Sequence, residues 1–105
     1  MQKKIIEQEQ LSSASHCYIE VSKWDIITLK KSEYIGKRIK IKGDFWWIRA
    51  NGQVMIKWID SSSDCTFDDS CIDAILCLEK NKNYTFYGTV MSKYSTPYLH
   101  IEAVE

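Results

Sequence analysis

The residues best suited to chemistry lie in residues 37–49, which read KRIKIKGDFWWIR. Lys40 and Lys42 occupy alternate positions and are followed by the adjacent pair Trp46 and Trp47. Ammonium groups neutralise phosphates, and indole rings stack on bases or pack against protein partners. These residue types at this spacing therefore point to a binding surface rather than to a catalytic centre.

More residues of the same kinds follow along the chain. The cations and aromatic residues of these kinds are Lys40, Lys42, Trp46, Trp47, Arg49, Lys57, Trp58, Lys93, Tyr94 and Tyr98. Adjacent strand residues point to opposite faces, so we expect Trp46 and Trp47 to divide between surface and core. We expect Trp46 to be the exposed one. In a regular strand, the inward-facing positions continue from Ile39 and Ile41 to Phe45 and Trp47. A bulge at Gly43 would reverse this choice.

Residue types that support catalysis or metal binding are sparse. The sequence has no glycine-rich phosphate loop, no HExxH and no GxSxG, and loop or capping duty accounts for Asp68 and Asp69. The four cysteines are Cys17, Cys65, Cys71 and Cys77. The last three are separated by five residues each, which is wider than the usual spacing of zinc ligands. We expect buried thiols rather than a metal site, no cofactor, and no enzymatic activity.

Composition favours one soluble domain. The chain has 105 residues, of which 45% are hydrophobic and 27% are charged. It shows no secretory signal pattern and no apolar run near the roughly 18 residues that span a bilayer. We expect an intracellular protein without membrane contact, nuclear in a eukaryote and cytoplasmic otherwise.

Charge is balanced overall but unevenly placed. The formal net charge is zero, yet residues 30–49 carry seven cations against two carboxylates, and residues 60–79 carry six carboxylates and no cation. A basic field over the whole chain, typical of an autonomous nucleic-acid binder, is absent. Any nucleic-acid contact must then be local or shared with a partner.

Periodicity predicts the elements that position these residues. Residues 1–15 are a polar tail, or else a short helix that orders on a partner, and residues 16–105 form the single domain. Residues 17–21 alternate as a half-buried strand, with Cys17, Ile19 and Val21 facing the core. Residues 25–37 form a connection that can cover one end of the core. Its apolar residues are Ile26, Ile27, Leu29, Tyr34 and Ile35.

The rest of the chain predicts five strands and one helix. Residues 38–48 form a long strand bent at Gly43, and Asn51-Gly52 turns it into a returning strand. A loop or a short third strand is expected around residues 65–67, and two final strands, NYTFYGTVM and YLHIEAV, flank a polar turn. Between the third strand and NYTFYGTVM we favour a helix over residues 71–80, with a strand as the alternative. Its expected buried side comprises Ile72, Ile75, Leu76 and Leu78.

This order of elements resembles the OB-fold, a five-stranded Greek-key barrel with a helix between strands three and four. The phrases YIGKRIKIKG, GQVMIKWID, NKNYTFYGTV and PYLHIEAV look like OB-fold strands, and the resemblance covers residues 34–104. The preceding CYIEVSKWDIITLKKSEYIGK is similar to the lead-in of the smallest subunits of replication protein A and of the telomere-capping CST complex. Stand-alone bacterial OB domains of the tRNA-anticodon-binding-like type resemble this chain in the shorter YIGK...G lead-in.

The resemblance implies that single strands bind across strands two and three, between the loops that join strands one to two and four to five. The ten cations and aromatic residues named above, from Lys40 to Tyr98, are therefore the expected binding surface. Two functional readings follow from this resemblance. In the favoured one, the chain is an accessory subunit of a single-stranded-DNA-binding complex, docks on a larger OB-fold subunit, and binds single-stranded DNA weakly by itself. Zero net charge favours this reading. In the alternative, it is an autonomous bacterial or viral OB domain that binds single-stranded nucleic acid directly.

Overall fold

The computed structural model describes residues 17–59 and 61–105. The predicted tail, residues 1–15, lies outside these residues. The elements in chain order are β1 (Ile19–Val21), α2 (Trp24–Leu29), α3 (Lys31–Tyr34), β2 (Arg38–Ile48), β3 (Val54–Lys57), β4 (Ser62–Phe67), the 3₁₀ turn η1 (Asp69–Cys71), α4 (Ile72–Leu76), β5 (Asn83–Lys93) and β6 (Thr96–Val104).

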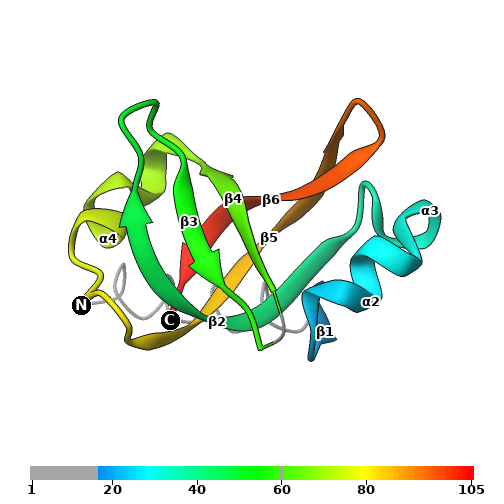
Figure 1. The fold of residues 1–105 in the computed structure, drawn as a ribbon, viewed down its shortest axis with the longest axis horizontal. Coiled ribbons are helices and arrows are strands. Elements are labelled where there is room, and N and C mark those ends of the chain that lie inside the picture. The colour runs from blue at the N-terminus through cyan, green and yellow to red at the C-terminus, as the bar shows by residue number, and fades with distance from the viewer. Residues whose placement is uncertain (1–16, 60) are drawn as a thin grey trace, which may run out of the picture.

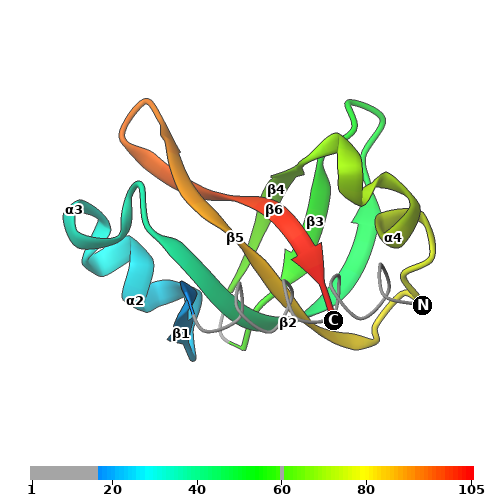
Figure 2. The same cartoon turned by 180° about the vertical axis from the view of Figure 1, so that it is seen from behind.

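Strands β2 to β6 close into a barrel. β2 pairs with β3, β3 with β4, β4 with β6, β6 with β5, and β5 returns to β2. These pairs are antiparallel except β4 with β6, which is parallel. Figure 1 shows β3 and β4 in front of β5 and β6, and Figure 2 shows the same barrel from behind. With α4 between β4 and β5, this is the OB-fold arrangement, so the predicted all-β class and five-stranded Greek-key barrel are confirmed.

Inward-facing residues of these strands form one core. β2 alternates between outward and buried residues from Arg38 to Phe45, as its period-two pattern predicts. Burying one aliphatic core side chain contributes on the order of 1.5–3 kcal/mol, so this alternation is enough to set the strand register. The buried barrel residues include Ile39, Ile41, Phe45, Val54, Ile56, Cys65, Phe86, Val90, Leu99 and Ile101.

The predicted Asn51-Gly52 hairpin joins β2 to β3. The Arg49 N–H donates to the Gln53 carbonyl at 2.7 Å, and the Asn51 side-chain oxygen accepts from the Gln53 N–H at 3.0 Å. Gly52 adopts a φ of +85°, a conformation that costs glycine little. Asn51 therefore acts through its side chain while Gly52 supplies the left-handed residue.

The segment before the barrel covers the core as predicted at Ile26, Ile27, Tyr34 and Ile35, but not at Leu29. It forms two short helices, α2 and α3, and Trp24 and Ile27 of α2 are buried in the core, whereas Leu29 is 84% exposed instead of covering it. In β1 the expected facing is wrong at Ile19, which is exposed, while Tyr18 is buried. β1 is a three-residue strand parallel to β2, and the contacts of Tyr18 set its facing.

The predicted helix over residues 71–80 exists but is shorter. Asp68 caps the preceding η1 by accepting from the Ser70 N–H, and α4 ends at Leu76. One helical turn presents one residue inward, so only Ile75 is fully buried. Leu78 is partly buried, and the expectation that Ile72 and Leu76 also face the core is wrong because both are exposed.

Gly43 marks a close approach rather than a bulge. It pairs in regular register with Tyr84 of β5, and it has no left-handed backbone conformation. A Cβ built on Gly43 would lie 2.6 Å from Ile56 Cγ2 and 2.7 Å from Trp58 Cε3. Glycine is required here because two core side chains occupy the space that a larger residue would need.

The cysteines divide between core and surface. Cys65 and Cys71 are buried as predicted, whereas Cys17 and Cys77 are exposed, contrary to expectation. Burial raises the pKa of the Cys65 thiol to about 12, so this group stays protonated. All four are free thiols, and no cluster of three or more His, Cys, Asp or Glu side chains suited to a metal occurs in residues 17–59 and 61–105.

Candidate nucleic-acid interface

Both tryptophans of the Trp46-Trp47 pair lie outside the core. Phe45 pairs with Ile56 and Trp47 pairs with Met55, so β2 carries one extra residue between these pairs. This bulge lies just after Phe45 and shifts the facing of Trp47 by one position. Phe45 is buried as predicted, but Trp47 is 47% exposed instead of inward. The expected division between surface and core is therefore wrong.

Trp46 is half-buried beneath two cations. Lys57 Nζ lies 3.4 Å from the centre of the Trp46 ring, and Lys80 Nζ lies 4.7 Å from it. The ring of Trp47 is next to it, with 6.1 Å between ring centres and an angle of 53° between planes. An open indole beside an indole that holds two ammonium groups can accept a base and a phosphate side by side.

Lys80 was not predicted from the sequence. It follows α4, and its place depends on backbone contacts with β2: the Asn81 N–H donates to the Phe45 carbonyl at 2.7 Å, and the Phe45 N–H donates to the Lys82 carbonyl at 3.1 Å. These contacts join residues far apart in the sequence. No local pattern indicated that Lys80 would reach Trp46.

Arg49 lies on the same side of the barrel but is already paired. Its Nε is 2.7 Å from Asp64 Oδ1. Asp64 pairs with Met55 across β3 and β4, and Met55 pairs with Trp47, so this ion pair adjoins the exposed indole. The carboxylate balances the charge of Arg49 and reduces its attraction for phosphate.

Trp58 is a core residue, which corrects its predicted place on the surface. It is 5% exposed and stacks on Trp24 with 5.4 Å between ring centres. Its indole N–H donates to Ser63 Oγ at 2.7 Å. Trp58 follows the outward Lys57 by one position and therefore faces inward, where α2 supplies the stacking partner.

The predicted residues of the β5–β6 hairpin are not brought together with the tryptophans. Figures 1 and 2 show this hairpin projecting from the side of the molecule away from α4. Tyr94 at its tip is 92% exposed, Lys93 is also exposed, and Tyr98 is partly buried. Tyr94 and Ser95 both have positive φ, which makes the turn tight.

Lys40 and Lys42 face outward on β2, but on its first half. Between them and the indoles lies Asp44, whose carboxylate accepts from the Asn83 side chain at 3.0 Å. The structure therefore groups Trp46, Trp47, Lys57, Lys80 and Arg49 on one surface, which we call the tryptophan face. It places the lysine pair farther along the same strand.

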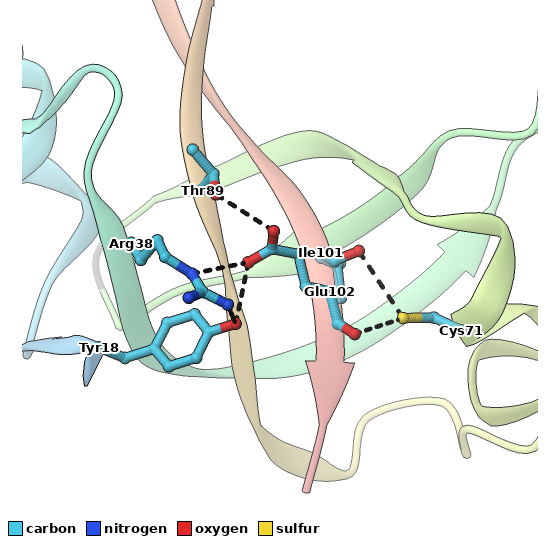
Figure 3. Close-up of polar contacts among 6 residues, drawn as sticks. All are labelled: Tyr18, Arg38, Cys71, Thr89, Ile101 and Glu102. Atoms are coloured by element: carbon cyan, nitrogen blue, oxygen red, sulfur yellow. Dashed lines mark hydrogen bonds and ion pairs between the residues drawn. The ribbon is translucent and has the colours of Figure 1, made fainter. Parts of the chain in front are cut away.

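A polar cluster joins Tyr18, which immediately precedes β1, to the barrel (Figure 3). Tyr18 Oη donates to Glu102 Oε1 at 2.9 Å, and Arg38 Nη2 donates to Tyr18 Oη at 2.8 Å. Thr89 Oγ1 also donates to Glu102, at 3.3 Å. Desolvation is the largest cause that raises the pKa of Tyr18, and the hydrogen bond to Glu102 is the next. The hydrogen bond to Tyr18 raises the pKa of Arg38. Both groups keep their protons, so the cluster is structural.

Comparisons with known proteins support the fold. No protein-family model matches this sequence, and no curated protein matches it either. A solved structure is similar in three dimensions. It is the crystal structure of a "putative nucleic acid-binding lipoprotein" from Klebsiella pneumoniae, with a TM-score of 0.61 and 19% identity over 84% of this chain and 92% of that one. Within the described part of the chain, no helix combines the length and hydropathy needed to cross a bilayer.

Proposed function

We propose that this protein is an autonomous OB domain that binds single-stranded nucleic acid on its tryptophan face. The observation that carries the proposal is the exposed Trp47 beside Trp46, whose ring lies under Lys57 and Lys80. OB-folds bind single strands through aromatic platforms and nearby cations on the outside of the barrel. The name of the Klebsiella protein supports this reading over that of an accessory subunit.

Each residue of the tryptophan face has a distinct proposed role. Trp47 stacks on a base, because its ring is the open one. Lys57 and Lys80, which both lie over the neighbouring Trp46 ring, neutralise phosphate beside that base. Trp46 positions both ammonium groups through cation–π contacts, which hold long side chains that would otherwise be mobile. This is binding without a chemical step, so we propose that the protein is not an enzyme.

An accessory subunit is the second candidate. Zero net charge favours it, and so do the exposed apolar side chains of Ile72 and Leu76 on α4, which a larger OB-fold subunit could cover. Under this reading, binding to an oligonucleotide is weak until the partner is present. Co-purification of the native protein and mass spectrometry would identify that partner.

Fluorescence anisotropy with a labelled oligothymidylate tests the first candidate. Removing one stacking platform costs about 1–3 kcal/mol, so Trp47→Ala should weaken binding by about 5- to 140-fold at fixed salt. Leu29→Ala is the matched control, since it removes an exposed apolar side chain from α2 and should bind like wild type. Both variants should melt near the wild-type temperature. Wild-type protein that fails to bind at low salt, or Trp47→Ala that binds unchanged, would refute the proposal.

A further inference from the structure

A groove of about 330 Å³ lies on the outer surface of the barrel, beside the first half of β2. β1 pairs with β2 at residues 39–41, and β3 pairs with the same edge from Asp44 onward. Neither strand pairs with Lys42 or Gly43, and the groove opens at this break. Figures 1 and 2 show β1 near the end of β3. Ile59, which follows β3, lines the groove together with Glu20 and Val21 of β1.

The polar cluster of Figure 3 fixes the β1 wall of this groove. Tyr18 immediately precedes β1, is bonded to Glu102 and Arg38, and packs edge-on against Tyr87 with 5.2 Å between ring centres. Tyr87 in turn lines the groove. The groove is therefore shaped by side chains that are themselves held in place, so its wall is preorganised before a ligand arrives.

The charges of the groove favour an anion. Lys40 and Lys42 both line it, and neither forms an ion pair within residues 17–59 and 61–105. Glu20 is the one carboxylate among the described lining residues, so two cations stand against one anion among those residues. The hydroxyl groups of Ser22 and Thr85 also line the groove and can donate hydrogen bonds. Two ammonium groups with hydroxyl donors between apolar walls suit a phosphodiester.

The groove and the tryptophan face lie along the same strand, β2. Lys42 and Trp46 both face outward on β2, four residues apart, which corresponds to about 13 Å along a strand. OB-folds bind about 4–16 nucleotides, and four nucleotides at about 3.4 Å each already reach that far. A single bound strand can therefore contact both places.

We propose that the groove between β1, β2 and β5 is a second subsite that binds a backbone phosphate of the strand whose base stacks on Trp47. The bound strand then follows the outer face of β2 from the tryptophans to β1. Lys40 and Lys42 hold the phosphate, and β1 forms the wall that confines it. This inference rests on the proposed function, because it assigns a path to the same nucleic acid.

Salt dependence of binding tests this subsite in the full chain. The double variant Lys40→Ala/Lys42→Ala should bind an eight-nucleotide oligothymidylate about fivefold or more weakly at low salt. Its slope of log K against log[salt] should fall by about 0.7, which is the contribution of the one phosphate that the two lysines no longer neutralise. Lys30→Ala/Lys37→Ala is the matched control, since it also removes two exposed lysines but leaves the groove and the indoles intact. Melting temperatures of both double variants should match wild type.

Oligonucleotide length separates the two proposals. A dinucleotide is too short to reach from Trp47 to the groove, so an NMR titration should give the Lys40→Ala/Lys42→Ala variant and wild type equal affinity for it. Glu20→Gln, which removes the carboxylate of the groove, should tighten binding of the eight-nucleotide strand alone. If Trp47→Ala loses binding while the Lys40/Lys42 variant keeps its salt slope, the second subsite is refuted and the tryptophan face stands. If wild type binds neither oligonucleotide, both proposals fail.

Discussion

Gly43 offers a quantitative test of how closely β2 approaches the core. A Cβ at this position would lie 2.6 Å from Ile56 Cγ2, about 0.8 Å closer than the 3.4 Å at which ordinary contact begins. Overpacking of this kind costs about 1–3 kcal/mol, and alanine recovers up to about 1 kcal/mol because it restricts the unfolded chain. We therefore expect Gly43→Ala to lose about 1–2 kcal/mol and to lower the melting temperature by about 4–16 °C. Gly43→Val adds two further methyl groups and should lose more.

Thermal and urea unfolding of a double-mutant cycle would establish the cause. Ile56→Ala removes the nearest obstructing atom, so Gly43→Ala should cost at least about 0.5 kcal/mol less in that background than in wild type. Gly36→Ala is the control. Gly36 has a φ of +88° with no atom near its added Cβ, so the cost of alanine there comes from backbone strain and should not depend on Ile56. A Gly43→Ala protein as stable as wild type, or a cycle without coupling, would refute the close approach.

Two further predictions concern single carboxylates. Asp64→Asn releases Arg49, so we expect tighter oligonucleotide binding and a salt slope of log K that is steeper by up to about 0.7. The loss of stability should stay below about 1 kcal/mol because the ion pair is exposed. Asp73→Asn on α4 is the charge-matched control, and equal affinities of the two variants would contradict the prediction. Hydrogen bonds from the Ser70 side chain and backbone lower the pKa of the Asp68 carboxyl group in the folded protein. The ionised carboxylate therefore contributes to stability above the ordinary aspartate pKa of about 3.9, and this contribution is lost as the pH falls through the lower pKa of the folded state. In urea unfolding, Asp68→Ala should be less stable than wild type at pH 7 and approach it in acid; a difference that persists in acid would show that the charge is not the cause.

The strands of the barrel could be predicted because their signals are local. Alternation of Ile39 and Ile41 with lysines, the Asn51-Gly52 turn and the apolar residues of β5 and β6 each lie within a few neighbouring positions. Each pattern has one arrangement that buries its apolar side. The order of these elements was therefore enough to recognise the OB-fold.

The tryptophans could not be assigned from the sequence because their positions depend on distant partners. The bulge after Phe45 appears only when β2 is paired with Ile56 and Met55 of β3. Trp58 is buried because α2, a segment that resembled a connection, supplies Trp24 as its stacking partner. A pattern of alternate residues records which side chains are apolar, but it does not record where one strand gains a residue over its neighbour.

The pairing of β2 with three different strands also affects how quickly the chain can fold. β2 pairs with β1 before it, with β3 directly after it, and with β5 near the C-terminus, where Arg38 is opposite Thr89. The last pairing must close a long loop before any contact across it forms, and such non-local contacts slow folding to milliseconds or seconds. During synthesis, residues 38–44 of β2 keep one open edge until β5 leaves the ribosome. The nascent chain is therefore most prone to aggregate in the interval between those two strands.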